Sequence, residues 1–131
     1  MNTTCLIIDD EKLARELLRE YLGGFPQIEI IGECAKGNEA VEKINKLKPD
    51  VIFLDVQMPG MNGFDVLEEI DHDPYVIFTT AYDKYAIQAI KNVAFDYLLK
   101  PIDENELLAV VIRYQNCKPQ ADLSSKIDQL L

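Results

Sequence analysis

The fold is decided by a short apolar run that ends in a carboxylate, Val51-Ile52-Phe53-Leu54-Asp55. An apolar run of this length without polar alternation is typical of a strand buried on both faces of a sheet. Similar runs predict strands at residues 5–8, 28–34, 51–54, 75–79 and 96–99. Amphipathic stretches between and after them predict helices at residues 11–22, 38–46, 63–70, 84–92 and 104–114. Five such alternations predict an α/β domain in which helices cover both faces of a parallel sheet.

The stretch at residues 11–22 illustrates the helical pattern. Its apolar residues recur at helical spacing, and they are Leu13, Leu17, Leu18 and Tyr21. The opposite side carries Lys12, Arg15, Glu16, Arg19 and Glu20. This division predicts that the first set packs on the sheet and that the charged set is mostly solvated. Gly23-Gly24 then ends the helix.

Length and composition indicate one soluble domain. No apolar run approaches the roughly 20 residues that cross a bilayer, and no basic segment precedes an apolar one at the N-terminus, so we expect a cytoplasmic location without membrane contact. The 13 basic and 23 acidic residues give a net charge of −10, which disfavours binding to DNA. The cysteines have no metal-binding spacing, so we expect Cys5 and Cys34 in the core and Cys117 at the periphery as free thiols.

The C-terminal residues lose helical periodicity after Lys118 and gain linker-forming residues, among them Pro119. We therefore predict a domain over residues 1–117, followed at 118–131 by the start of a linker to an absent output domain.

Polar residues follow four of the predicted strands. They are Asp9-Asp10, Asp55, Thr79-Thr80 and Lys100-Pro101. If the strand order is 2-1-3-4-5, strands one and three flank the point where the order reverses, and three carboxylates meet there. Carboxylates so close require a cation, and oxygen ligands favour Mg²⁺ or Mn²⁺. Lys100 and Thr80 would complete a site for a phosphoryl group carried by Asp55.

Each of these residues also has an ordinary structural interpretation. Asp10 is a preferred helix N-cap, and Asp55 is a reasonable turn residue ahead of Pro59-Gly60. Lys100 alone would be a surface lysine, and Thr80 alone a β-forming residue at a strand end. Their coincidence at four strand ends favours a functional site. His72, the only histidine, is expected to be a solvated loop residue without a role.

Four segments resemble the receiver domain of bacterial two-component response regulators, over about residues 3–115. They are LIIDDE at 6–11, DVQMPGMNG at 55–63, TTA at 79–81 and YLLKP at 97–101. The resemblance implies a flavodoxin-like (βα)5 fold, with a doubly wound five-stranded parallel sheet of order 2-1-3-4-5. It also implies a phosphoacceptor signalling domain rather than an enzyme, with at most self-catalysed phosphoryl transfer and autodephosphorylation.

The same resemblance assigns roles to site residues. Asp55 would be the phosphoacceptor, and Mg²⁺ would be held by Asp10, Asp55 and the Gln57 carbonyl, with Asp9 acting largely through water. Thr80 and Lys100 would contact the phosphoryl group, the Lys100–Pro101 bond would be cis, and Tyr97 would be the switch aromatic. A sensor histidine kinase would dock around Ala14 and Leu18. Helix four, strand five and helix five would form a homodimer face.

A narrower likeness comes from FTTAYDKYA at residues 78–86 and AFDYLLKP at 94–101, which look like the LytTR class of regulators. That class carries a C-terminal DNA-binding domain, so DNA would be bound only through an output domain that this chain lacks. A stand-alone receiver that acts through protein partners remains an alternative. An aspartyl-phosphate phosphatase fits less well, because Gln57 stands where its second aspartate would be. A flavin or nucleotide carrier would need a phosphate loop after strand one, and none is present.

Overall fold

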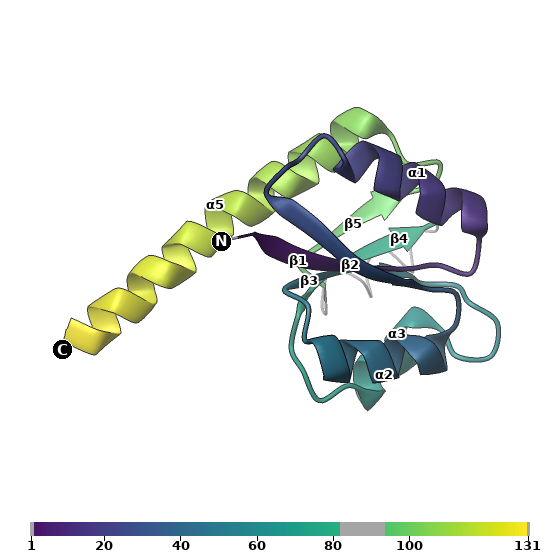
Figure 1. The fold of residues 1–131 in the computed structure, drawn as a ribbon, viewed down its shortest axis with the longest axis horizontal. Coiled ribbons are helices and arrows are strands. Elements are labelled where there is room, and N and C mark those ends of the chain that lie inside the picture. The colour runs from purple at the N-terminus through teal and green to yellow at the C-terminus, as the bar shows by residue number, and fades with distance from the viewer. Residues whose placement is uncertain (1, 82–93, 131) are drawn as a thin grey trace.

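The structure, a computed structural model, describes residues 2–81 and 94–130, with side chains described as far as residue 117. Its five parallel strands form one sheet in the order β2-β1-β3-β4-β5 (Figure 1). The strands are β1 (Thr3–Ile8), β2 (Ile28–Cys34), β3 (Val51–Asp55), β4 (Tyr75–Thr80) and β5 (Asp96–Leu99). The helices are α1 (Lys12–Leu22), α2 (Gly37–Leu47), α3 (Gly63–Glu69) and α5 (Glu104–Leu130). The predicted fold and strand order are confirmed, while the helix predicted at 84–92 lies outside the described residues.

Two apolar layers lie on the two faces of the sheet. Helices α1 and α5 cover one face and α2 and α3 cover the other (Figure 1). Successive strand residues alternate between the layers, as in β3, where Phe53 packs under α1 and α5 and Leu54 packs under α2 and α3. Because both faces are covered, the central strands are apolar throughout, which is the feature that made them recognisable in the sequence.

The strand register brings the carboxyl ends of the strands to one edge of the sheet. Ile8 pairs with Leu54, and Asp55 pairs with Thr79. Thr80 in turn pairs with Leu99. The residues at and just after these positions are therefore neighbours in space, although they are up to about ninety positions apart in the chain.

The buried face of α1 differs from the prediction. Leu18 and Leu22 are buried, whereas Leu13 is 78% exposed. At about 3.6 residues per turn, Leu13 lies on the opposite side of the helix from Leu18 and Leu22. Arg15 lies on the same side as the two buried leucines, and only 17% of its side chain is exposed. The prediction that Leu13 packs on the sheet and that Arg15 is solvated was wrong.

Helix α5 also differs, because it continues to Leu130 instead of ending near residue 114. Its C-terminal half projects away from the sheet (Figure 1). No glycine follows Gly63 in the sequence, so the residue type that most often ends a helix is missing from this region. The division of the chain into a domain and a linker at residue 117 remains a prediction.

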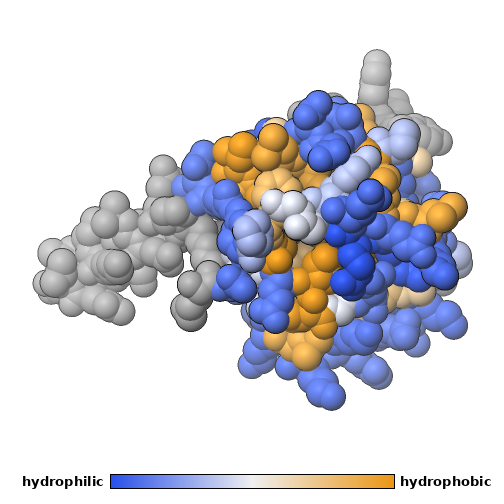
Figure 2. All heavy atoms as spheres, turned by 45° about the horizontal axis from the view of Figure 1, so that its top comes forward, coloured by the Kyte–Doolittle hydropathy of each residue, from blue (hydrophilic) through white to orange (hydrophobic). Residues whose placement is uncertain are grey.

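The cysteines are free, with Cys5 and Cys34 buried and Cys117 half-buried. Burial raises the pKa of the Cys5 thiol to about 12 and that of Cys34 to about 11, so both are inert core residues. Within the described part of the chain, no helix combines the length and hydropathy of a membrane span. Figure 2 shows a face on which hydrophilic residues surround separate apolar areas.

Candidate functional site

Three carboxylates meet at the carboxyl edge of the sheet. Asp9 follows β1, Asp10 comes next, and Asp55 ends β3. One carboxylate oxygen from each lies within 4.8 Å of the others. Asp9 and Asp55 are buried, with 1% and 3% of their surface exposed, while Asp10 is exposed. The structure thus brings together the three acidic residues that the strand-end pattern predicts.

The backbone around Asp9 is held at several points. Its N–H donates to the Cys34 carbonyl at 3.0 Å, and its Oδ1 accepts from the N–H of Glu11 at 2.9 Å. The N-cap of α1 is Glu11, whose own side chain makes no capping hydrogen bond. The alternative interpretation of Asp10 as an N-cap is therefore wrong, and the Asp10 carboxylate remains directed toward the cluster.

Asp55 is supported from the loop that follows it. The N–H of Gln57 donates to Asp55 Oδ1 at 3.2 Å, and Gly63 donates its N–H to the Val56 carbonyl at 3.0 Å. A Cβ at position 63 would lie 2.7 Å from the Asp55 carbonyl oxygen and 2.8 Å from a ring carbon of Phe78. Only glycine lets α3 begin this close to the phosphoacceptor candidate.

Lys100 enters the cluster from the end of β5. Its Nζ lies 2.8 Å from Asp9 Oδ2, 3.4 Å from Asp55 Oδ2 and 3.6 Å from Glu11 Oε1. Its N–H donates to the Thr80 carbonyl at 2.7 Å, and the Lys100–Pro101 peptide is cis, as the resemblance implied. Burial alone would lower the Lys100 pKa, but the hydrogen bond to Asp9 and the surrounding carboxylates outweigh it, and the pKa is raised. Lys100 therefore stays charged.

Burial and the neighbouring charges change the pKa of the Asp55 carboxyl. Burial, followed by the charge of Asp9, raises the pKa of its carboxyl to about 7. A hydrogen bond with Asp10 acts in the same direction, while Lys100 and the Gln57 N–H oppose the shift. A single ammonium thus compensates the three carboxylates only in part, and a second cation would favour the ionised form of Asp55.

The donor set fits a hard divalent cation. All three acidic ligands offer oxygen, which suits Mg²⁺ rather than a metal that prefers nitrogen or sulfur. An open groove lined by Asp10, Gln57, Met58 and Asn62, among others, leads to the exposed side of the cluster. An incoming ion could therefore keep several waters, as Mg²⁺ usually does.

Two further predicted residues lie at the edges of this site. Thr80 is 1% exposed at the end of β4. Tyr97 is half-buried on β5 and packs against the apolar layer under α2 and α3. Strand alternation places Asp55 on the other face of the sheet, so Tyr97 is not part of the carboxylate cluster.

Thr79 precedes Thr80 on β4 and is buried beside the end of β3. It pairs with Asp55 in the register and faces the same side of the sheet. Thr79 is 1% exposed, and its Oγ1 has no hydrogen-bond partner among the described residues.

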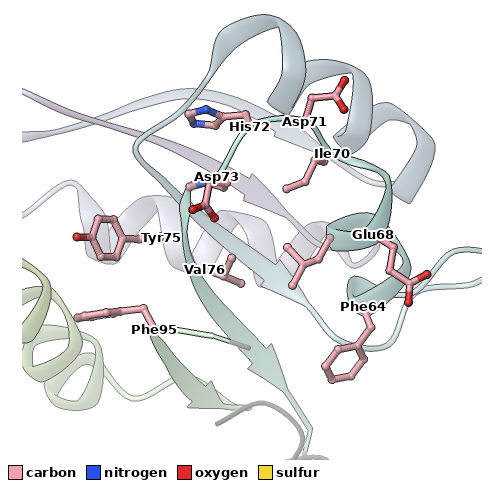
Figure 3. A pocket seen from close by; sticks show the side chains of 11 residues that line it. Phe64, Glu68, Ile70, Asp71, His72, Asp73, Tyr75, Val76 and Phe95 are labelled. Carbon is pink, nitrogen blue, oxygen red and sulfur yellow. The ribbon is translucent and has the colours of Figure 1, made fainter. Parts of the chain in front are cut away.

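A larger hollow lies at the other end of β4, where Tyr75 begins the strand (Figure 3). Its lining includes His72, Asp73, Tyr75 and Phe95. His72 lies in the loop before β4, as predicted, but it is half-buried rather than fully solvated, with Nε2 2.7 Å from the Pro49 carbonyl oxygen. Because Thr80 ends β4 at the opposite edge, this hollow is separate from the carboxylate site.

Comparisons with known proteins identify the family of this fold. Residues 5–112 match the response regulator receiver domain family. The chain is 50% identical to the transcriptional regulatory protein BtsR of Salmonella typhi over 121 residues, which are 91% of this chain and 51% of that protein. The chain therefore spans about half the length of this curated relative.

Solved structures show the same likeness. The REC domain of AraT, a response regulator from Geobacillus stearothermophilus, superposes with a TM-score of 0.80 and 35% identity, covering 93% of this chain and 99% of that domain. A chain from the CheX-CheY-BeF3-Mg+2 complex of Borrelia burgdorferi superposes with a TM-score of 0.75 and 27% sequence identity. The match covers 86% of this chain and 88% of that chain. This chain belongs to the response regulator receiver domain family.

Proposed function

We propose that the chain accepts a phosphoryl group on Asp55 in a Mg²⁺-dependent reaction. The observation that carries the proposal is the buried Asp55 carboxylate, which lies 3.4 Å from Lys100 Nζ and within 4.8 Å of the Asp9 and Asp10 carboxylates. A similar chain, solved in a complex with BeF3 and Mg²⁺, supports both the metal and the phosphoryl-like ligand.

In this proposal the acidic residues and the Gln57 carbonyl hold the ion, with Asp9 acting largely through water. Bound Mg²⁺ would offset the carboxylate charge and hold a phosphoryl oxygen. Asp55 must be ionised to attack phosphorus, and Lys100 favours that ionised form. As the bond between phosphorus and the donor breaks, Lys100 and Thr80 would stabilise the transferred group by charge and by a hydrogen bond.

The expected phosphoryl donor is a sensor histidine kinase in the cytoplasm. Phosphorylation would draw Thr80 toward the new group, and Tyr97 would turn inward and change the face that includes β5 and α5. That face would form a homodimer and control an output domain. The name of the BtsR relative supports a role in transcription, and we assign the output to the LytTR class of DNA-binding domains.

The proposed function is tested by intact-mass analysis after incubation with acetyl phosphate and Mg²⁺. The native chain should gain one phosphoryl adduct, and the adduct should disappear with EDTA or in Asp55→Asn. Lys100→Met should reduce the amount of adduct by at least tenfold.

The matched control is Lys48→Met, which removes an exposed lysine away from the cluster. An adduct that survives in Asp55→Asn would show that another residue is the acceptor. Failure of the native chain to form an adduct, while it still binds Mg²⁺, would refute phosphoacceptance and leave only a metal-binding receiver fold.

A further inference from the structure

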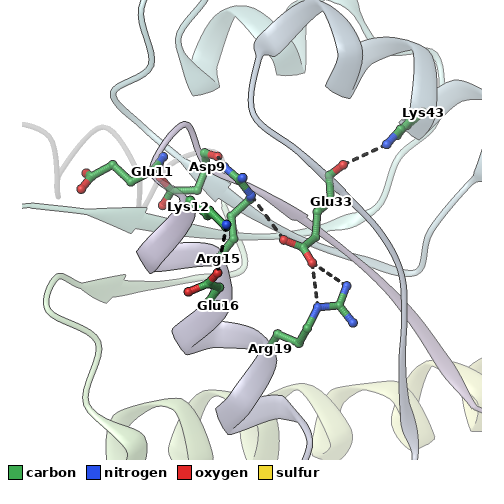
Figure 4. A network of polar contacts seen from close by, with 8 residues as sticks. All are labelled: Asp9, Glu11, Lys12, Arg15, Glu16, Arg19, Glu33 and Lys43. Atoms are coloured by element: carbon green, nitrogen blue, oxygen red, sulfur yellow. Dashed lines mark hydrogen bonds and ion pairs between the residues drawn. The ribbon is translucent and has the colours of Figure 1, made fainter.

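Arg15 connects the backbone of the carboxylate cluster to the edge of the sheet. It lies on the buried side of α1, one turn before Leu18. Its Nη1 donates to the Asp9 carbonyl oxygen at 2.7 Å (Figure 4). That carbonyl belongs to the peptide between Asp9 and Asp10, so the contact acts on the backbone unit that joins two residues of the cluster.

A second contact holds the guanidinium through Nε. Arg15 Nε lies 3.3 Å from Glu33 Oε1 on β2. Glu33 is itself held, because its Oε2 lies 2.6 Å from Arg19 Nη2 and its carbonyl accepts from Lys43 at 2.9 Å (Figure 4). The Arg15 guanidinium is therefore held through two of its nitrogens, Nη1 and Nε, and its side chain has little rotamer freedom left.

These contacts hold the Asp9–Asp10 segment from two directions. The next residue of β2, Cys34, accepts the Asp9 N–H at 3.0 Å, while Arg15 binds the Asp9 carbonyl. A peptide plane whose carbonyl is fixed cannot rotate without breaking a charge-assisted hydrogen bond. The directions of the Asp9 and Asp10 side chains depend on that plane.

We infer that Arg15 is a positioning residue, which orients the Asp9–Asp10 peptide so that both carboxylates meet a divalent cation. The inference rests on the proposed Mg²⁺ site. Partners of this kind, one step removed from the metal, typically change metal affinity by 10–100-fold when they are removed.

The charge of Arg15 and its orienting role would change the Mg²⁺ affinity in opposite directions when Arg15 is removed. A guanidinium close to a bound cation repels it, so removal of the charge alone would tighten Mg²⁺ binding. Loss of orientation would weaken binding instead. The direction of the change in Kd therefore separates the two roles.

The experiment is calorimetric titration of Mg²⁺ into native protein, Arg15→Met and Arg15→Lys. Methionine keeps most of the apolar stem, and lysine keeps the charge but cannot bridge Asp9 and Glu33 at once. We expect the Kd to rise about tenfold in Arg15→Met. Arg15→Lys should also bind more weakly than the native chain.

The matched control is Arg19→Met, which removes the other guanidinium on Glu33 but has no contact with the Asp9 carbonyl. Its Kd should stay within about twofold of the native value. As a readout without metal, the amide resonance of Asp10 should shift in EDTA-treated Arg15→Met and stay in place in Arg19→Met.

The inference is overturned if Arg15→Met binds Mg²⁺ as well as or better than the native chain, or if Arg19→Met weakens binding equally. Absence of saturable Mg²⁺ binding by the native chain would overturn the metal site of the proposed function and this inference with it. An unchanged Asp10 resonance in Arg15→Met would show that the guanidinium does not set the peptide orientation.

Discussion

The ionisation of Asp55 is opposed by its own surroundings, and this has a consequence for stability. Its pKa is raised to about 7 in the folded chain, against 3.8 for an unperturbed aspartate. Between about pH 4 and pH 7 the unfolded chain releases this proton while the folded chain retains it. The contribution of Asp55 to the free energy of unfolding therefore falls as the pH rises through this window, and is fully lost above pH 7.

Asp55→Asn should remove this dependence, because an amide cannot ionise. In EDTA, we expect the variant to be more stable than the native chain by at least about 1 kcal/mol at pH 8, since each pKa unit corresponds to about 1.4 kcal/mol. At pH 4 the difference should nearly vanish. Urea unfolding at both pH values measures it, and a difference that is the same at pH 4 and pH 8 would contradict the raised pKa.

The residues of the site differ in how visible they were in the sequence. Asp9, Asp55 and Lys100 could be placed because a buried strand fixes which residues follow it at the sheet edge. Arg15 could not, because a charged residue on an amphipathic helix is normally assigned to the solvated face. Helical spacing places Arg15 on the side of Leu18 and Leu22, but its contacts with the Asp9 carbonyl after β1 and with Glu33 on β2 cannot be read from that spacing.

At the scale of the element, the faces and ends of helices were also hard to predict, because they depend on contacts that the sequence does not show. The start of α1 was predicted to within one residue, but Leu13 was assigned to the wrong face, because helical spacing puts it opposite the buried Leu18 and Leu22. The end of α5 was predicted too early, because the helix continues through Pro119 to Leu130, and no glycine after Gly63 is present to end it. The central strands were predicted more closely, since burial on both faces leaves an almost uninterrupted apolar run.

The start of α3 yields a prediction about packing. Gly63→Ala would place a methyl group 2.7 Å from the Asp55 carbonyl oxygen and 2.8 Å from the Phe78 ring. Alanine favours helices by up to about 1 kcal/mol over glycine, but backbone this close cannot move aside cheaply. We expect a net loss of about 1–3 kcal/mol in the free energy of unfolding, measured in urea.

Gly24→Ala is the control, because its new Cβ would meet only the Tyr21 carbonyl oxygen, at an ordinary 3.5 Å. It should change stability by no more than about 0.5 kcal/mol. Equal effects of the two substitutions would show that the close approach of α3 to Asp55 is not limiting.

At the scale of the whole molecule, charge repulsion acts at two ranges. The net charge of −10 is spread over the chain, and the Asp9, Asp10 and Asp55 carboxylates concentrate part of it within 4.8 Å. Dissolved salt of any kind screens the spread-out charge, whereas only a bound cation relieves the cluster. The two contributions can therefore be separated by comparing MgCl2 with NaCl at equal ionic strength.

We expect Mg²⁺ to raise the melting temperature well beyond the effect of NaCl. At ten times its dissociation constant, Mg²⁺ should add about 1.4 kcal/mol to the free energy of unfolding, because it binds the folded chain alone. Asp10→Asn removes an exposed ligand with little effect on packing, so its melting temperature should respond to both salts almost equally. If the native chain also melted at the same temperature in both salts, screening alone would account for the stabilisation, and the cluster would have no specific affinity for Mg²⁺.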